Sequence, residues 1–329
     1  ERSSARLSIS QSMSEAFGAR YGFAFTPIAN GIRRSDWPTA TRRAANGALK
    51  IRYAGSLAEN MTLDTVKLVS QAVEDLAADG TDVTFEIKTR ERWRDTLQSH
   101  FSDAVRTSFI VTDLSPKEYR AWLSEADVVV IAYNFDDVSK SYTRHSLANK
   151  LPECLASGAA LLAVGPADIA TMSVLEEIDC GMHVNENQQH QVAEALRKLA
   201  GSADERYRLA EKAQKVASEK FNIKTGREQL ANELTRAGSN PAAADNTGRP
   251  RTVGAHVDET AVVARLLSNR RGRDHILLDV GAHFGTSSSY FDKLGWTIYC
   301  FEPDPNNRIR LQDKYATSAN VTIDPRAVS

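Results

Sequence analysis

The sequence has few cysteines, no long apolar run and no excess of charge of either sign. Its three cysteines, Cys154, Cys180 and Cys300, lie far apart without a CxxC pair, and no histidine stands at a spacing suited to zinc. This pattern excludes a disulfide framework, gives no metal site, and predicts reduced, buried thiols. We therefore expect a cytoplasmic protein.

The chain also lacks the features of a membrane-spanning or nucleic-acid-binding protein. No apolar stretch approaches the roughly 20 residues of a membrane helix, and no signal peptide is visible. Lysine and arginine number 41 against 42 aspartates and glutamates, which gives a formal net charge of -1. Such a balance argues against a general nucleic-acid partner. Peripheral association with the inner membrane stays open, and the sequence does not indicate an oligomeric state.

What the sequence does contain is an alternation of apolar strands and helices. The 329 residues correspond to about two domains. Strands are expected at residues 49–55, 83–87, 107–111, 127–133 and 159–164. Helices are expected at 62–80, capped by Thr62, at 90–101, at 115–126, capped by Ser115, and from 168, followed by two polar helices that reach Leu234. This order predicts an α/β fold with a doubly wound parallel sheet.

Residues 142–165, YTRHSLANKLPECLASGAALLAVG, connect two of these strands. Their helix is expected to begin near Ala148 or Asn149, because Pro152 is tolerated only in a first turn, and to end at Gly158. Its N-terminus would face the carboxyl ends of the strands, where open α/β sheets bind ligands and free amides favour phosphate. The polar side chains around this point are Arg144, His145, Ser146, Asn149, Lys150 and Glu153. A solvated helix start, with Glu153 complementing the dipole, explains the same spacing equally well.

This segment resembles the donor-binding signature of GT-B glycosyltransferases, in the version HS..NKL.E.LASG that is typical of bacterial surface-polysaccharide enzymes. The resemblance implies that Glu153 holds the ribose hydroxyls of a nucleotide-sugar. The first signature position, usually acidic, is His145 here. An imidazole can donate to a sugar hydroxyl or a phosphate, but it cannot repeat the role of a carboxylate.

The same resemblance places Gly55 and Ser56, in the turn GSLAENMT, in the donor site. Retaining members of the family usually carry an Arg and a Lys in that turn, and this sequence has neither. Lys150 and Arg144 are then the favoured source of positive charge, and Lys88 and Arg90 are the alternative. The resemblance identifies no catalytic residue.

The resemblance also implies the domain organisation. Residues 1–34 would be the remnant of an N-terminal acceptor-binding domain with its hinge, and residues 35–236 the nucleotide-sugar-binding domain. Residues 237–254 have no apolar period and are rich in Gly, Pro, Asn and Ala, so they are predicted to be a linker. Residues 255–329 would begin a further domain.

That last part contains a second nucleoside-binding pattern. A strand at 276–280 runs into a glycine turn, and a second strand at 296–301 ends in Glu302. Glycines let the backbone approach a cofactor, and an acid after the second strand can accept two ribose hydroxyls. An ordinary strand-end turn, with no ligand at Asp279 or Glu302, is the alternative.

The runs DVGAHFG and FEPDP resemble the opening of FkbM-type S-adenosylmethionine methyltransferases. The resemblance implies that Asp279, Gly281, Ala282 and Gly285 line the cofactor turn and that Glu302 holds the ribose. Residues 320–329 look like the third strand of the same fold. Residues 255–329 would therefore form the first part of a truncated Rossmann-like methyltransferase domain.

These patterns together predict a glycosyltransferase of surface polysaccharide or glycan biosynthesis, fused to an S-adenosylmethionine-dependent O-methyltransferase. It would take a nucleotide-sugar as donor and a glycan as acceptor, and this chain alone would be inactive. A noncatalytic GT-B-like module that scaffolds a glycan methyltransferase is the alternative, supported by His145 and the missing loop cations. Another nucleotide-utilising GT-B enzyme, such as a sugar epimerase, would require catalytic acids that the sequence does not identify.

Overall fold

The computed structural model describes residues 5–43, 47–237 and 259–326 of the chain. They belong to two compact units, the first within Ala5–Ala242 and the second within Ala243–Ser329. Of the linker predicted at 237–254, all but the first residue lies outside the described residues. Each unit is described by itself.

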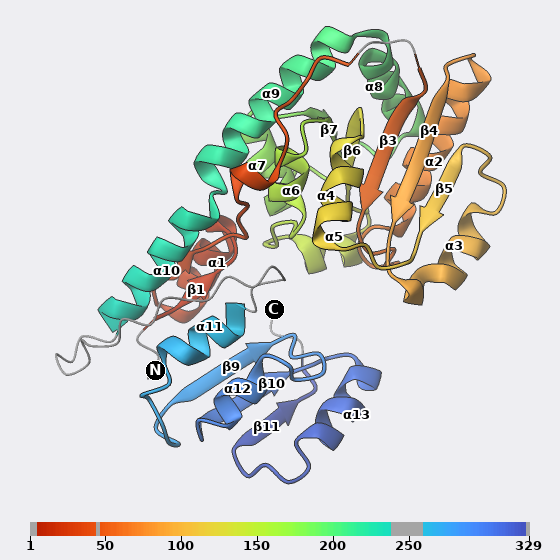
Figure 1. Cartoon of the computed structure of the whole chain (residues 1–329). Coiled ribbons are helices and arrows are strands. Elements are labelled where there is room, and N and C mark those ends of the chain that lie inside the picture. Colours follow the sequence, from red (N-terminus) through yellow and green to blue (C-terminus); the bar gives the residue numbers. More distant parts are fainter. Residues whose placement is uncertain (1–4, 44–46, 238–258, 327–329) are drawn as a thin grey trace. The chain divides into compact units, whose positions relative to one another are not determined.

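The first unit is built on a six-stranded parallel sheet (Figure 1). Its strands, in spatial order, are β5 (Thr107–Ile110), β4 (Val83–Lys88), β3 (Leu49–Ala54), β6 (Val128–Ala132), β7 (Ala160–Val164) and β8 (Met182–Val184). The order runs outward in both directions from β3 and β6, so the predicted doubly wound fold is confirmed. The carboxyl ends of β3 and β6 form the switch point at which such sheets bind ligands.

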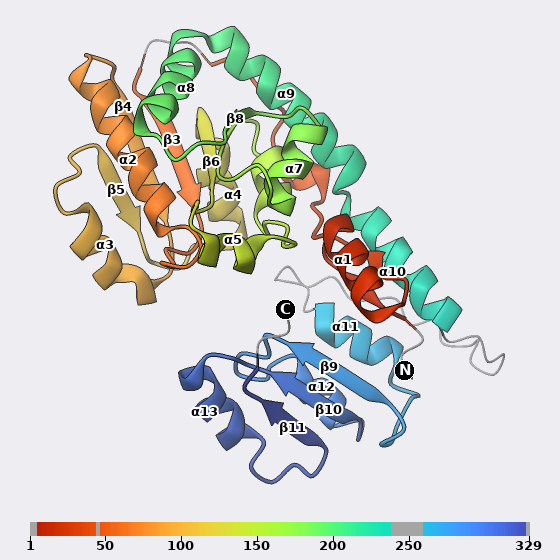
Figure 2. The same ribbon diagram turned by 180° about the vertical axis from the view of Figure 1, so that it is seen from behind.

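Helices cover both faces of this sheet (Figures 1 and 2). One apolar core lies under α2 (Leu63–Ala78), α3 (Arg94–Phe101) and α8 (Gln189–Gly201). The other lies under α4 (Pro116–Ser124), α6 (Leu151–Ala156), α7 (Ala170–Glu177) and α9 (Ala203–Lys220). Every residue of β6 and β7 is buried, as expected for strands that are covered on both faces.

Short elements complete the unit. Strands β1 (Leu7–Ser8) and β2 (Thr26–Pro27) pair in parallel and flank α1 (Gln11–Tyr21). The predicted helix at 90–101 is a 3-10 turn, η2 (Glu91–Trp93), followed by α3. A second such turn is η1 (Arg34–Asp36), and α5 (Asp137–Thr143) follows β6.

The end of the unit differs from the prediction. Three helices, not two, follow β8, because the helical conformation is interrupted between α9 and α10 (Ile223–Ala237). At the break Ile32 pairs with this backbone: its N–H donates to the Phe221 carbonyl (2.7 Å) and its carbonyl accepts from the Ile223 N–H (3.0 Å). A contact with a segment almost 200 residues away in sequence therefore ends the helix, and α10 runs alongside α1 (Figure 2).

Of the two predicted helix caps, one is confirmed. Ser115 caps α4 in a reciprocal capping box with Glu118. Thr62 occupies the N-cap position of α2, but its side chain makes no capping bond and donates instead to the Ser56 carbonyl (2.7 Å).

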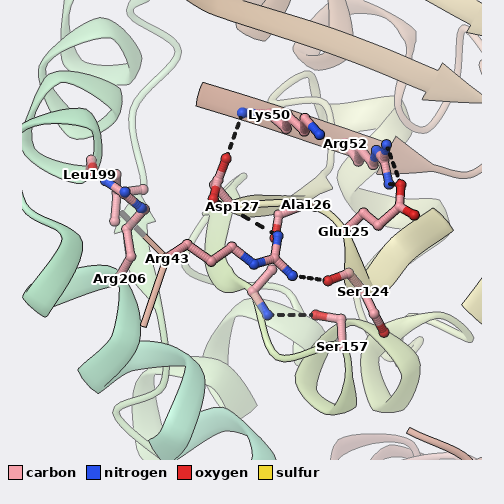
Figure 3. Close-up of polar contacts among 11 residues, drawn as sticks. Arg43, Lys50, Arg52, Ser124, Glu125, Ala126, Asp127, Ser157, Leu199 and Arg206 are labelled. Atoms are coloured by element: carbon pink, nitrogen blue, oxygen red, sulfur yellow. Dashed lines mark hydrogen bonds and ion pairs between the residues drawn. The ribbon is translucent and has the colours of Figure 1, made fainter. Parts of the chain in front are cut away.

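The amino edge of the sheet is held by contacts within the protein (Figure 3). Arg43 donates to the Ala126 carbonyl (2.6 Å) and lies 3.9 Å from Asp127, whose carboxylate also accepts from the Lys50 N–H (2.9 Å). Further along β3, Arg52 is buried and lies 3.4 Å from both Glu86 and Glu125. With the charges of this edge engaged in this way, the opposite, carboxyl edge is the candidate ligand edge.

The second unit has a three-stranded parallel sheet in the order β11 (Val321–Asp324), β10 (Thr297–Phe301), β9 (Ile276–Val280). Helices α11 (Glu259–Leu266), α12 (Ser288–Asp292) and α13 (Pro305–Lys314) accompany it. Its core centres on Phe291, Ile298, Cys300 and Leu311. The predicted partial Rossmann-like order is confirmed. Ile276, Leu278 and Val280, on the other face of β9, are 45–61% exposed.

Candidate functional site

The donor-site residues predicted from the sequence gather at the carboxyl edge of the six-stranded sheet. Gly55 and Ser56 follow β3, Lys88 ends β4, and Lys150 is the N-cap residue of α6. The helix begins at Leu151, later than predicted, because Thr171 fixes the preceding residues in a turn. Its hydroxyl accepts from the Ala148 N–H (2.9 Å) and donates to the Ser146 carbonyl (3.0 Å).

Glu153 and Lys150 come together as predicted, with a third residue, Tyr119 of α4. The Glu153 carboxylate lies 2.8 Å from the Lys150 ammonium and accepts from the Tyr119 hydroxyl (3.2 Å). The same ammonium stands 4.5 Å from the centre of the Tyr119 ring. Burial raises the pKa of Tyr119 well above its usual range, and the charge of Glu153 adds to this, so the hydroxyl stays a donor at neutral pH.

The two cation pairs that the sequence offers for this site, Lys150 with Arg144 and Lys88 with Arg90, have different surroundings. Partial burial lowers the pKa of Lys88, the charge of Asp113 opposes this effect, and the charges of Lys150 and Arg90 lower the pKa further. Lys88 therefore experiences one carboxylate as well as two other cations. Arg144 is exposed. The pKa of Asp168 is lowered chiefly by its hydrogen bond to Lys140, against the opposing effect of burial, and the charge of Arg144 lowers it a little further.

The remaining signature residues contact the segment that precedes the sheet. A ring nitrogen of His145 lies 2.8 Å from the Ser12 hydroxyl, and its carbonyl accepts from Ser10, the N-cap residue of α1 (2.6 Å). The Asn149 side chain accepts from Asn30 (3.2 Å). His145 and Asn149 thus join the signature to residues 5–34, and Ser146 contributes its carbonyl to Thr171.

The turn after β3 is held rigidly. The Gly55 carbonyl accepts from the Thr89 hydroxyl (2.7 Å), and the Ser56 carbonyl accepts from Tyr53 (2.8 Å). A Cβ on Gly55 would lie only 2.7 Å from a carbon of the Tyr53 ring, so the glycine is needed for this packing. The turn presents a fixed backbone to the switch point.

Sequence reasoning missed Asn134, which follows β6 and is 1% exposed. Its side chain donates to the Glu59 carbonyl (2.7 Å) and accepts from the Thr65 N–H (3.1 Å), and its own N–H donates to Met61 (2.8 Å). Asn134 therefore joins the end of β6 to the turn after β3 and to the first turn of α2. The one signal in the sequence was an amide at a strand end.

The five predicted cofactor residues of the second unit lie around one turn. Glu302 is 4% exposed, and its carboxylate accepts from the His283 N–H (2.7 Å) and the Asp304 N–H (2.9 Å). Asp279 accepts from the Ser288 hydroxyl. Ala282 is buried, and Gly281 and Gly285 have left-handed backbones (φ +73° and +67°).

This turn fits a nucleoside cofactor. No atom lies within 4 Å of the point where a Gly281 Cβ would stand, so the backbone is open to a ligand there. The Glu302 Oε1 atom accepts from the Asp304 N–H (2.9 Å) and from the Asn307 side chain (3.5 Å), whereas Oε2 accepts from the His283 N–H and keeps a lone pair for a ribose hydroxyl. The three cysteines are buried as predicted; burial raises the pKa of Cys154 to about 12 and that of Cys180 to about 11.

Among the described residues, no cluster of His, Cys, Asp or Glu could hold a metal ion. In the same part of the chain, no helix has the length and apolar character needed to cross a membrane.

Comparison with known proteins supports the fold. No protein-family model matches the chain, and no curated protein matches its sequence. Among solved structures, sucrose-phosphate synthase from Thermosynechococcus elongatus is similar over 71% of this chain and 58% of its own, with 14% identity and a TM-score of 0.54. Anabaena HepE, solved with UDP and glucose, is similar over 70% of this chain and 63% of its own, with 15% identity and a TM-score of 0.55.

WaaG, titled a glycosyltransferase involved in lipopolysaccharide biosynthesis, is similar over 70% of this chain and 62% of its own, with 16% identity and a TM-score of 0.51. The chain thus spans about three fifths of the length of these structures. At these identities the likeness shows the fold alone, which is the Rossmann-like fold of GT-B glycosyltransferases.

Proposed function

We propose that the first unit binds a nucleotide-sugar at the carboxyl edge of its sheet and serves a glycosyltransferase of surface polysaccharide or glycan biosynthesis. The observation that carries this proposal is the cluster of Glu153, Lys150 and Tyr119 at the carboxyl edge of the sheet, the edge at which Lys88 ends β4. The fold supports it, since a structure of similar fold, HepE, was solved with UDP and glucose.

In this proposal each charged residue has a role. Glu153 accepts the ribose hydroxyls, and the Tyr119 hydroxyl orients its carboxylate. Lys150 and Lys88 stabilise the negative charge that develops on the diphosphate as the bond to the sugar breaks. The acceptor hydroxyl would come from a glycan that is held by an acceptor-binding domain. In this proposal residues 5–34 belong to that domain. We expect this chain alone to bind the donor without transferring its sugar, because a two-domain cleft aligns the acceptor and excludes water.

Calorimetric titration with UDP and with uridine tests the proposal. Glu153→Ala should weaken the binding of both ligands by about 1.5–3 kcal/mol, the range for a hydrogen bond to a charged group. Lys150→Ala should weaken UDP more than uridine, because only UDP carries the diphosphate. Glu205→Ala, which removes the carboxylate of an ion pair with Arg208 on α9, is the matched control and should change neither affinity.

The same titration decides the alternative. A noncatalytic module that scaffolds a methyltransferase has no affinity for nucleoside diphosphates. Absence of UDP binding would therefore favour the scaffold over the glycosyltransferase. Binding of UDP that neither variant alters would reject the assignment of the site to Glu153 and Lys150.

For the second unit we propose binding of S-adenosylmethionine, as the start of an O-methyltransferase domain. The open Gly281 backbone and the buried Glu302 support this proposal. When bound, the cofactor supplies an electrophilic methyl group; Glu302 holds the ribose and fixes the turn through the His283 N–H. Titration with S-adenosylhomocysteine should show binding that Glu302→Gln weakens. A cytoplasmic site of action, peripheral to the inner membrane, belongs to the same proposal.

A further inference from the structure

The first unit has an open pocket of about 540 Å³ that the proposed donor site does not use. It lies between residues 33–34 and the first half of α10. Lys224, Arg227, Glu228 and Ala231 line it from one stripe of that helix, at the spacing of one helical face. Four of its eight lining side chains are cationic, namely Arg33, Arg34, Lys224 and Arg227, and one, Glu228, is acidic.

The positive charge of this pocket is not neutralised within the described part of the protein. The Arg34 guanidinium donates to the Trp37 carbonyl (2.7 Å) and to the Gln214 side-chain oxygen (2.9 Å), which are both neutral. These bonds fix its position and leave its charge in place. Arg227 makes no hydrogen bond or ion pair with any described residue.

The other two cations have only long, exposed partners. Lys224 lies 3.9 Å from Glu228, and Arg33 lies 4.0 Å from Asp36. Exposed pairs at such distances contribute little and exchange readily for a better anion. The lining charge, four cations less one carboxylate, is therefore about three positive charges that a ligand could meet.

The walls of the pocket are held in place. Ile32, next to Arg33, pairs with the backbone on both sides of Asn222, and a Cβ on Gly31 would come within 2.8 Å of the Ile223 backbone. The two cation-bearing segments thus meet backbone to backbone. Because the backbone that carries the cations is fixed, binding an anion has to order only their side chains.

We propose that this pocket binds a phosphate or diphosphate group. Guanidinium groups pair with phosphate oxygens through two parallel hydrogen bonds, and this pocket offers Arg33 and Arg227 for such pairing, beside the charge of Arg34. Asn30, which contacts Asn149 of the donor signature, precedes Arg33 by three residues. That is at most about 11 Å of chain, so the group could belong to a phosphorylated glycan near the donor site or be a free anion.

The test is calorimetric titration of the whole chain with inorganic pyrophosphate and with glucose 1-phosphate, in about 0.15 M salt. Arg227→Ala should weaken binding about tenfold and Arg227→Glu should abolish it, because the first removes and the second reverses an unpaired charge. Arg227 is exposed, so both variants should fold, which their melting curves will show. Arg236→Ala, on the same helix but outside the pocket lining, is the control and should bind as the parent does.

Pyrophosphate could also occupy the donor edge, and Lys150→Ala separates the two sites. Binding that survives Lys150→Ala and is lost in Arg227→Glu establishes the pocket. A higher affinity for glucose 1-phosphate than for pyrophosphate would then identify a sugar-borne phosphate, and the reverse order a free diphosphate. Binding that Arg227→Glu leaves unchanged, or that Lys150→Ala abolishes, would overturn the proposal while leaving the donor site standing.

Discussion

Two glycines in the second unit have similar left-handed backbones and different surroundings. A Cβ on Gly285 would lie 2.5 Å from the Tyr315 ring and 2.6 Å from a Leu311 methyl group, whereas one on Gly281 would meet nothing within 4 Å. Both substitutions to alanine carry the roughly 1–2 kcal/mol cost of a left-handed residue. Gly285→Ala adds overpacking, typically another 1–3 kcal/mol.

Gly285→Ala should therefore destabilise the second unit more than Gly281→Ala does. Hydrogen exchange of peptides from β10 and α13 in the whole chain measures this difference. Gly281→Ala should instead weaken S-adenosylhomocysteine binding, because its methyl group enters the open space beside the turn. Equal protection in the two variants would contradict the packing argument for Gly285.

The buried tyrosines should make the first unit lose stability at alkaline pH. Burial raises the pKa of Tyr53, Tyr119 and Tyr133 above the usual value. A raised pKa means that the folded chain holds these protons more tightly than the unfolded chain. The stabilisation is complete below pH 10 and is lost above it, at up to about 1.4 kcal/mol per pH unit for each tyrosine.

Urea unfolding between pH 8.5 and 11 should therefore show a falling free energy of unfolding, and Tyr53→Phe should make that fall less steep. Tyr142→Phe, which changes a tyrosine that is 60% exposed, should leave the slope as it is. Identical slopes for the parent and Tyr53→Phe would count against the buried, protonated state of Tyr53.

At the scale of elements, the start of helix α2 depends on Asn134, a residue that follows strand β6. Thr65 is the third residue of this helix. Its N–H donates to the side chain of Asn134, which lies 69 positions later in the sequence. Thr65 is buried, so Asn134→Ala would leave its N–H without this partner, at a cost of about 1–3 kcal/mol.

Urea unfolding measures this cost, and Asn149→Ala is the matched control. Asn149 is an exposed amide with one long hydrogen bond, so its removal should change the free energy of unfolding by less than about 0.5 kcal/mol. Asn134→Ala should also weaken UDP binding, because the turn that contains Ser56 loses its attachment to β6. If the two variants were equally stable, Asn134 would not hold the turn.

The elements themselves were largely predictable, and their ends were less so. The buried strands β6 and β7 appear in the sequence as continuous apolar runs, and Ser115 with Glu118 forms a cap entirely from local residues. The predicted start of α6 and the predicted number of helices after β8 were wrong. Thr171 determines the start of α6 and Ile32 the end of α9, and both lie far from these helix ends in sequence. Local propensity contains no information about such contacts.

At the scale of the whole molecule, the site was predictable where its residues share one segment. Lys150 and Glu153 lie three residues apart, and both carboxyl-edge turns follow directly from the order of strands. Tyr119 and Asn134 join the site through tertiary packing, and in the sequence each resembles an ordinary core or loop residue. The choice between the cation pairs Lys150 with Arg144 and Lys88 with Arg90 stays a prediction, because it depends on which of them meets a bound diphosphate.

A crystal structure of the chain with UDP would show where the nucleotide binds. We expect the ribose within hydrogen-bonding distance of Glu153 and the diphosphate beside Lys150 and Lys88, at the carboxyl edge between the Ser56 turn and α6. UDP bound elsewhere, with its diphosphate on Arg227 or away from the switch point, would contradict this placement.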